Sequence, residues 1–437
     1  MTSNLPRTKP APVPVPEPHH GRAWAVTVML VLLALINWAD KAVLGLVAVP
    51  LMRDLGIGPG EYGLLASAIY FLFAVSAVFA GFLANRRSTK WMLVWMVVIW
   101  SVSQYAIWLA PTFLVIFLAR IVLGFGEGPS AGLSFHAAAK WFPDEKRTLP
   151  VALQNVGAFG GIAVAAPALT WIISHHDWHW AFFAVGTAGV VWLLIWLFVG
   201  REGPLDGSKP AAKGTVFDSG IRVRYRTLLT TRSFIGATLV GLSAYWGLAV
   251  LSAWLPAYLR TSHGYSATAA ANIVMGVSLT AVGFLVVQAL LTSAMMKRGV
   301  SSRIARSGMA SLSTALAGGF VIISAGTSTG ALQIVVLCLG FGLGLVTFTT
   351  GAVTISEFVP VLQRGAVLGL YVAILTSAGV FAPAVFGWIV SADGAGQAHG
   401  YTVALLVSGV FIAFGGVAGL VLINPKRDIA RIAAAAG

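Results

Sequence analysis

Long apolar segments separated by short polar ones make up most of the chain. A helix that crosses a lipid bilayer needs about 20 predominantly apolar residues. Twelve segments meet this requirement: 24–50, 61–84, 91–110, 112–138, 149–174, 180–200, 233–259, 268–296, 304–325, 331–357, 364–391 and 400–423. The longest polar interruption follows the sixth segment. The pattern predicts an all-α membrane protein with two six-helix bundles, 23–200 and 233–424, joined by a loop over 201–232.

The lysines and arginines are distributed unevenly among the predicted loops. Of the 28, 24 fall in the two tails and in the loops on the same side of the membrane as the tails. Arg53 and Arg260 lie on the opposite side, and Lys41 and Arg120 fall inside predicted spans. Cytoplasmic loops carry an excess of positive residues. We therefore expect both termini to be cytoplasmic, with the protein in a bacterial cytoplasmic (inner) membrane.

The composition supports lipid as the solvent. The chain is 58% hydrophobic and 10% charged, whereas soluble proteins average about 25% charged residues. The net charge of +14 follows from the loop asymmetry, so no nucleic acid is expected as a partner. The proline-rich segment 1–22 and the segment 425–437 are predicted to be cytoplasmic tails, the first of them disordered. The single cysteine, Cys338, excludes an intrachain disulfide and a cysteine-based metal site.

The two predicted bundles contain an internal repeat. The residues of 123–128 (LGFGEG) match those of 339–344 (LGFGLG), and Ala-Pro-Ala at 166–168 matches Ala-Pro-Ala at 382–384. Both pairs are separated by 216 positions. Two homologous halves with the same orientation are typical of one transporter architecture, in which the substrate site lies between the halves near the middle of the membrane.

Four ionisable residues lie deep inside predicted spans: Asp40, Lys41, Arg120 and Glu127. Each costs about 2.5–3.5 kcal/mol at the centre of a membrane helix on insertion scales, so such residues should face the bundle interior or a cavity and pair. Asn37 shares a helix face with Lys41, four residues on. Two cations could hold an organic anion and two carboxylates could carry protons; alternatively, the four form structural ion pairs only.

Several motifs resemble the major facilitator superfamily and, within it, the anion:cation symporter family of organic-anion transporters. The resemblance covers nearly the whole chain after residue 22. The motifs that carry it are Asn37-Trp38-Ala39-Asp40-Lys41, the stretch from Arg120 through Gly124 to Glu127-Gly128-Pro129, Trp141-Phe142-Pro143, Trp178-His179-Trp180-Ala181-Phe182, Trp254-Leu255-Pro256, and the loop Gly81–Arg86.

The resemblance implies proton-driven import of a small organic anion, such as a sugar acid, a hydroxy acid or an aromatic carboxylate. It implies that Asp40 and Glu127 carry the protons, and that Lys41 and Arg120 hold the anion. The remaining expected substrate contacts are Asn37, Tyr70, Phe73, Gln154, Asn155, Tyr371 and Thr376. Three departures from the family pattern make the pocket less polar: Lys41 in place of arginine, Phe73 without a hydroxyl, and Val372 and Thr376 in place of asparagines. We therefore expect a less hydroxylated or aromatic acid.

Charged residues at the cytoplasmic ends of the spans are expected to gate access. Arg86 belongs to the loop motif, and Arg147 and Arg364 nearly share the repeat offset. Glu357 ends the tenth span near Arg364, where we expect a latch with the basic loops.

Two other functions remain open from the residues alone. A drug/proton antiporter of the same fold usually has a Gly-Pro-x-x-Gly-Gly element in the fifth span. The stretch here reads Asn155-Val-Gly157-Ala-Phe-Gly160-Gly161 and lacks that proline. A membrane-embedded enzyme would need a zinc, serine-nucleophile or nucleotide motif, and none is present. The clustered histidines at 175–179 could bind zinc or lie in an interfacial loop. We expect a monomer with no cofactor and no metal.

Overall fold

The computed structural model describes residues 20–84, 86–143, 146–205 and 222–436, and every regular element in these ranges is a helix. Twelve helical segments are long and apolar enough to cross a membrane, which confirms the predicted number. They are α1 (His20–Leu55), α2 with α3 (Pro59–Ala68, Phe73–Ala84), α4 (Thr89–Leu109), α5 with α6 (Phe113–Glu127, Ser130–Ala139), α7 (Thr148–His175), α8 (His179–Val199), α10 (Arg232–Ala253), α12 (Ala267–Lys297), η2 with α13 (Arg303–Gly308, Met309–Ala325), α14, η3 and α15 (Ala331–Leu345, Val346–Thr349, Thr350–Phe358), α16 (Val361–Ala392) and α17 (Gln397–Leu422).

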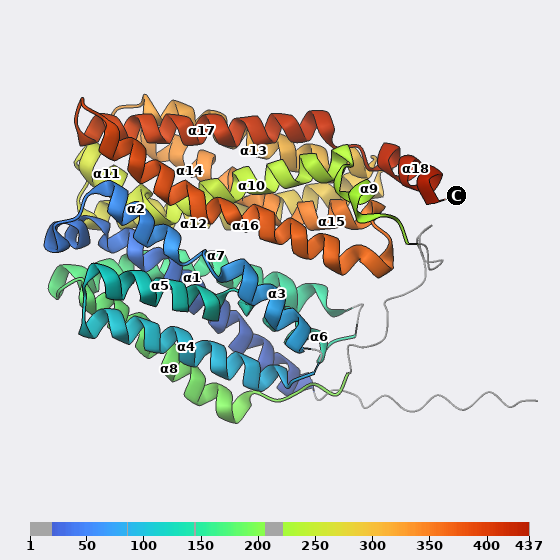
Figure 1. The fold of residues 1–437 in the computed structure, drawn as a ribbon, viewed down its shortest axis with the longest axis horizontal. Helices are drawn as coiled ribbons and strands as arrows, with labels where there is room; N and C mark the ends of the chain where they lie inside the picture. Colours follow the sequence, from blue (N-terminus) through green and yellow to red (C-terminus); the bar gives the residue numbers. More distant parts are fainter. Residues whose placement is uncertain (1–19, 85, 144–145, 206–221, 437) are drawn as a thin grey trace, which may run out of the picture.

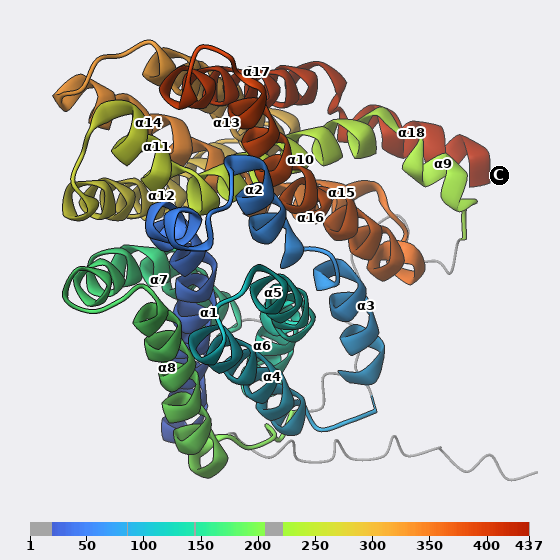
Figure 2. The same ribbon diagram turned by 60° about the vertical axis from the view of Figure 1, so that its left-hand side comes forward.

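The helices form two bundles that correspond to the two halves of the sequence. Figure 1 shows α1 to α8 in the lower bundle and α10 to α17 in the upper one. The same separation persists in the turned view, where α4 and α8 lie far from α13 and α17 (Figure 2). The halves meet where α2 packs along α16 and where α7 packs along α12. Proline lies inside both α7 and α16, at Pro167 and Pro383, as the repeat predicts.

Two spans of the first half are interrupted side by side. The second span breaks at 69–72 between α2 and α3, and the fourth breaks at Gly128 and Pro129 between α5 and α6. A β-carbon at Gly124 would lie 1.7 Å from the carbonyl oxygen of Ile69, and one at Gly128 would lie 2.1 Å from that of Phe73. The glycines therefore allow the two backbones to touch, and Glu127 is held beside the break.

The halves are closed against each other at the end opposite the termini, in what we call the outer seam. Tyr62 of α2 places its hydroxyl 3.0 Å from the carbonyl oxygen of Leu44 and 2.9 Å from that of Ala253 in the other half. The ring of Trp254, in the second half, packs edge-on against the ring of Tyr62, with centroids 4.7 Å apart. A β-carbon at Gly45 would lie 1.9 Å from the carbonyl oxygen of Ser252, so α1 and α10 are in backbone contact here.

The seventh span differs from its predicted extent of 233–259. Helix α10 ends at Ala253, and a separate helix α11 (Leu255–His263) follows Trp254. Pro256 explains the break, because proline has no N–H to donate to the carbonyl of Ser252. The carbonyl oxygens released at this point face the outer seam, where Tyr62 binds Ala253.

Each of the three predicted polar segments contains helical residues. Helix α1 begins at His20, inside the predicted 1–22 tail, whose residues 1–19 lie outside the described part of the chain. The middle loop contains the short helix α9 (Tyr225–Leu229), and its residues 206–221 also lie outside the described part. The segment 425–437, predicted as a cytoplasmic tail, forms the helix α18 (Pro425–Ala436) over most of its length. It docks because buried Asp428 accepts a hydrogen bond from the backbone N–H of Ser233 at 2.8 Å, at the start of α10.

Candidate functional site

A cavity of about 280 Å³ lies between the halves, on the terminus side of the outer seam. Residues of α1, α3, α6 and α7 form one wall, and residues of α10, α12 and α14 to α16 form the other. Seven of the nine predicted substrate contacts line it: Asn37, Lys41, Phe73, Gln154, Asn155, Tyr371 and Thr376. The remaining two, Tyr70 and Arg120, lie next to it in a separate small cavity.

Lys41 occupies the centre of the polar wall. Its ammonium lies 2.7 Å from Oε2 of Glu127 and 2.6 Å from Oδ1 of Asn37, and its side chain is buried. The rings of Phe73 and Trp38 lie 5.6 and 5.9 Å from the same ammonium. A lone buried ammonium would be strongly disfavoured, whereas a carboxylate and two aromatic faces stabilise it. The second oxygen of Glu127, Oε1, has no hydrogen-bond partner among the described residues.

Asp40 faces away from this pair, although it adjoins Lys41 in sequence. It is fully buried, and Oδ1 accepts a hydrogen bond from Nε2 of Gln104 in α4 at 2.5 Å. Arg120 donates to the backbone carbonyl of Asp40 at 3.4 Å. The sequence interpretation missed Gln104; the signal that could have found it is a single amide among the apolar residues of the third span.

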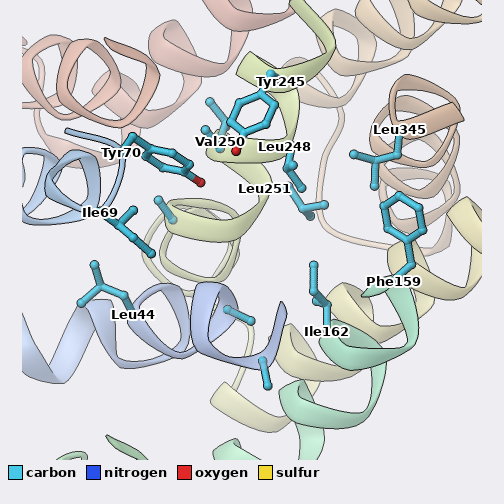
Figure 3. Packing of buried hydrophobic residues seen from close by; sticks show 14 of the residues in the cluster. Leu44, Ile69, Tyr70, Phe159, Ile162, Tyr245, Leu248, Val250, Leu251 and Leu345 are labelled. Carbon is cyan, nitrogen blue, oxygen red and sulfur yellow. The ribbon is translucent and has the colours of Figure 1, made fainter. Parts of the chain in front are cut away.

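Arg120 and Tyr70 line a cavity of only about 10 Å³, together with Ser252 and Ala249 of α10. That volume accommodates about one water molecule. Lys41 is the one residue that lines both cavities as the structure describes them. Figure 3 shows Tyr70 and Tyr245 pointing toward each other from the two halves, with ring centroids 5.7 Å apart. The two compartments thus lie on either side of Lys41, and the smaller one lies next to the outer seam.

The two walls of the main cavity differ in polarity. On the first wall, Nδ2 of Asn37 and both amide atoms of Gln154 are buried without a partner in the described structure. Asn155 differs from its neighbour, because its amide donates to the carbonyl of Val151 at 3.2 Å. The second wall is largely apolar and aromatic, as in Leu248, Leu285, Leu345, Phe348, Val372 and Leu375. A bound molecule would therefore meet hydrogen-bond donors on one side and apolar surface on the other.

Tyr371 lines the second wall, yet its hydroxyl lies in a slot between two helices. A β-carbon would approach the hydroxyl oxygen to 2.8 Å if placed on Gly241 and to 2.0 Å if placed on Gly351. The hydroxyl has no partner among the described residues. The two glycines create the space that the tyrosine occupies.

The predicted gating residues form contacts related by the repeat. Arg147 donates to the carbonyl of Phe142 at 2.8 Å, and Arg364 approaches the carbonyl of Val359 at 3.5 Å, in each case five residues earlier. Glu357 binds Arg306 at 2.7 Å. The latch expected at Glu357 therefore uses η2 of its own half. Arg86 is exposed at the end of α3.

The outer histidines are engaged with aromatic rings. His175 stacks on Trp171 and His179 stacks on Trp178, with centroids 4.6 and 3.9 Å apart. Among the described residues, no group of three or more side chains of the metal-ligating types His, Cys, Asp and Glu comes together. Tryptophan is one of the residue types that are enriched where membrane helices reach the membrane–water interface.

Comparison with known proteins gives the family context. A family model described as Major Facilitator Superfamily matches residues 30–383. The chain is 25% identical over 415 residues to the hexuronate transporter of Bacillus subtilis (strain 168), covering 92% of this chain and 94% of that protein. It is 23% identical over 433 residues to the D-galactonate transporter of Escherichia coli O6:H1 (strain CFT073), covering 93% and 97%.

A solved structure shares the fold. The inward-facing, unoccupied structure of a bacterial homolog to the human lysosomal transporter Spinster superposes with a TM-score of 0.75 at 18% identity. The match covers 94% of this chain and 98% of that one.

Proposed function

The chain belongs to the Major Facilitator Superfamily, and from this premise we propose that it is a proton-coupled symporter that imports a small organic anion by alternating access. Its family and fold are those of a multi-pass membrane transporter and not of an enzyme, as the sequence predicted. The relatives named above support an anion as substrate and do not favour the drug antiporter. We place the transporter in a bacterial cytoplasmic membrane, as a monomer with both termini inside.

The buried pair of Lys41 and Glu127 is the observation that carries this proposal. Lys41 lines the cavity, but its charge is already balanced by Glu127 at 2.7 Å. A substrate carboxylate that binds Lys41 displaces Glu127 and leaves it as a buried anion without a partner, unless it takes up a proton. Proton and anion binding therefore favour each other, and this coupling is reciprocal.

In this proposal the same pair also disfavours transport of the anion or the proton alone. The empty site holds Lys41 and Glu127 as a neutral pair, and the fully loaded site holds Lys41 with the substrate anion beside a protonated Glu127. With only the anion bound, or only the proton, the site has an unbalanced buried charge, and this charge is costly when the halves close around it. Only the empty and fully loaded forms then cross readily between the two open states.

Arg120 and Asp40 have supporting roles in this proposal. Arg120 faces the small cavity beneath the outer seam, so we assign it to the substrate anion in the state in which the seam is open. Asp40, with Oδ2 unpartnered in the described structure, is the second proton-carrying candidate.

The substrate that fits the main cavity is a carboxylate with few hydroxyl groups. Lys41 is the only cation lining the cavity as described, and the second wall is largely apolar. A polyhydroxy acid would place several hydroxyls against that wall without partners, at a cost of about 1–3 kcal/mol for each buried group. An aromatic or apolar acid avoids this cost. Preferential binding of hexuronate over aromatic acids would contradict the assignment of substrate class.

Glu127→Gln tests the coupling directly, because glutamine is a fixed neutral form. In proteoliposomes, the variant should exchange substrate in counterflow yet fail to accumulate it when a pH gradient is imposed. Asp40→Asn should show a similar, weaker defect, and Asp177→Asn, at an exposed carboxylate outside the spans, serves as the control. Full gradient-driven accumulation by Glu127→Gln would remove Glu127 from the proton path.

Gln154 and Asn155 offer a matched pair for locating the substrate. Gln154 has free amide atoms at the cavity, whereas the Asn155 amide donates to its own helix. Gln154→Leu should weaken binding about tenfold, the loss expected for one hydrogen bond of about 1.4 kcal/mol. Asn155→Leu should have a smaller effect. Equal effects in a binding titration would mean that the amide at 154 does not contact the substrate.

A further inference from the structure

A second cavity, of about 510 Å³, lies on the flank of the second half that faces away from the first half and from the substrate site. Residues of η2 and the start of α13 form one side, and the last turns of α17 form the other. We call it the α13–α17 groove; it is lined by Ser301, Arg303, Ile304, Ser307, Gly308, Met309, Leu312, Gly419, Leu420 and Ile423. Because it lies on a membrane-spanning surface, its deeper part faces lipid.

The groove changes from polar to apolar along its length. Ser301 and Arg303 lie at the terminus-side edge, where α12 gives way to η2. Ile304 follows Arg303, Leu312 lies further into the span in α13, and Leu420 lines the other side from the last turn of α17. These three residues are 56%, 49% and 39% exposed, in that order. A phospholipid has the same order of chemistry, with a charged headgroup at the interface and chains below.

Arg303 is the free cation of this groove. Arg306, the other arginine of the π-helical turn η2, is bound to Glu357 at 2.7 Å, and Ser302 donates to the same carboxylate. Arg303 has no ion pair in the described structure and is exposed. Single π-helical turns within longer helices occur frequently at functional sites. Here the turn separates an inward-facing arginine from one directed to the groove.

The surrounding charges are positive. Lys297 and Arg298 are exposed at the end of α12 beside the groove, and Lys426 is exposed just beyond α17. No aspartate or glutamate occurs in 295–312 or in 415–427. The nearest acids along the chain, Glu357 and Asp428, are already paired with Arg306 and Arg427. A bound phosphate diester would therefore meet cations without competition from a carboxylate.

We propose that the α13–α17 groove binds an anionic phospholipid of the adjoining leaflet, with the phosphate on Arg303 and an acyl chain along Leu312 and Leu420. Basic pockets between membrane helices bind anionic headgroups in this way. The apolar floor distinguishes this ligand from a free anion, which would have no contact with Leu312. The proposal does not depend on the identity of the transported substrate.

The test measures lipid retained by purified full-length protein, by native mass spectrometry after titration with phosphatidylglycerol or phosphatidylcholine. The protein should retain phosphatidylglycerol in preference, and Arg303→Gln should lower that retention roughly fivefold, the effect expected of one interfacial cation. Arg87→Gln removes an exposed arginine from the same edge of the other half and should change little. Leu312→Trp fills the apolar floor without changing the charge and should also lower retention.

Three results would overturn the proposal. Unchanged retention in both Arg303→Gln and Leu312→Trp would mean that the lipid binds elsewhere. Equal losses in Arg303→Gln and Arg87→Gln would indicate general surface charge without a site. Displacement of phosphatidylglycerol by glycerol phosphate alone would make the groove a free-anion site.

Discussion

Gly45→Ala should shift the transporter toward the state in which the outer seam is open. The β-carbon of alanine would lie 1.9 Å from the carbonyl oxygen of Ser252, whereas real β-carbons essentially never approach closer than 3.0 Å. Helices α1 and α10 would have to separate by about 1.1 Å, the difference between these distances. Such separation would also lengthen the contacts of the Tyr62 hydroxyl, which bridges the halves beside it.

The size of the shift follows from the cost of overpacking. An extra methyl group in a closely packed interface costs about 1–3 kcal/mol. If the strain exists only while the seam is closed, the equilibrium between the two open states changes by about 5- to 150-fold. Gly45→Ala should therefore change how much of the folded protein has its outer seam open, and residues beneath the seam should become more accessible from that side.

Labelling of a cysteine beneath the seam measures this population. Ala249 lines the small cavity and is 1% exposed, so Ala249→Cys, combined with Cys338→Ser, should react slowly with a membrane-impermeant maleimide added from outside. Adding Gly45→Ala should raise the rate at least about fivefold, the lower limit of the calculated shift. Gly283→Ala is the control, since its added β-carbon would meet no atom within 4 Å beyond the adjoining residues and local backbone of its own helix. An unchanged rate in a folded Gly45→Ala protein would refute the reasoning.

Three further changes test other parts of the structure. Burial raises the pKa of Glu202, but hydrogen bonds from the Lys140 ammonium, the Lys90 N–H and Ser88 outweigh burial and lower the pKa overall. The stability that this carboxylate contributes is therefore present above its pKa in the unfolded chain and is lost as the pH falls through its lower pKa in the folded protein. Glu202→Gln should reduce the acid sensitivity of the melting temperature and cost about 1 kcal/mol at neutral pH, a small value because solvent screens the partly exposed site. Asp428→Ala should release α18 and cost about 1–3 kcal/mol, because the N–H at the start of α10 loses its acceptor; thermal melting and proteolysis of the C-terminus measure this. Gly351→Ala should displace the Tyr371 ring from its slot and weaken substrate binding measurably by calorimetry, and unchanged affinity would show that the slot is irrelevant to binding.

The sequence alone was sufficient for the architecture. Twelve spans were predicted because spanning lipid requires long apolar segments, which is a property of local composition. The repeat at 216 residues anticipated the two bundles and the prolines inside α7 and α16. The four deep charges were recognisable because charge in the membrane is expensive wherever it occurs.

The pairing of those charges was decided only by the tertiary structure. Arg120 and Glu127 share a helix, and helical spacing places them on one face, yet the partner of Glu127 is Lys41, which is 86 residues away. Asp40 adjoins Lys41 but turns to Gln104 in another helix. Glu357 was expected to pair with the basic loops, but only the structure identifies its partner as Arg306, 51 residues away.

The division of the site into two cavities, the outer seam and the docking of α18 also depended on how helices meet. Lys41 lines both cavities because α1 crosses between them, and Gly45 marks the seam because α10 comes within backbone contact there. Hydrophobicity and charge belong to each residue and can be added along a segment, so spans and deep charges can be recognised from the sequence without knowing what they contact. Which side chains come within 3 Å depends on the rotation and crossing of helices far apart in the chain, and that is determined by packing across the whole bundle.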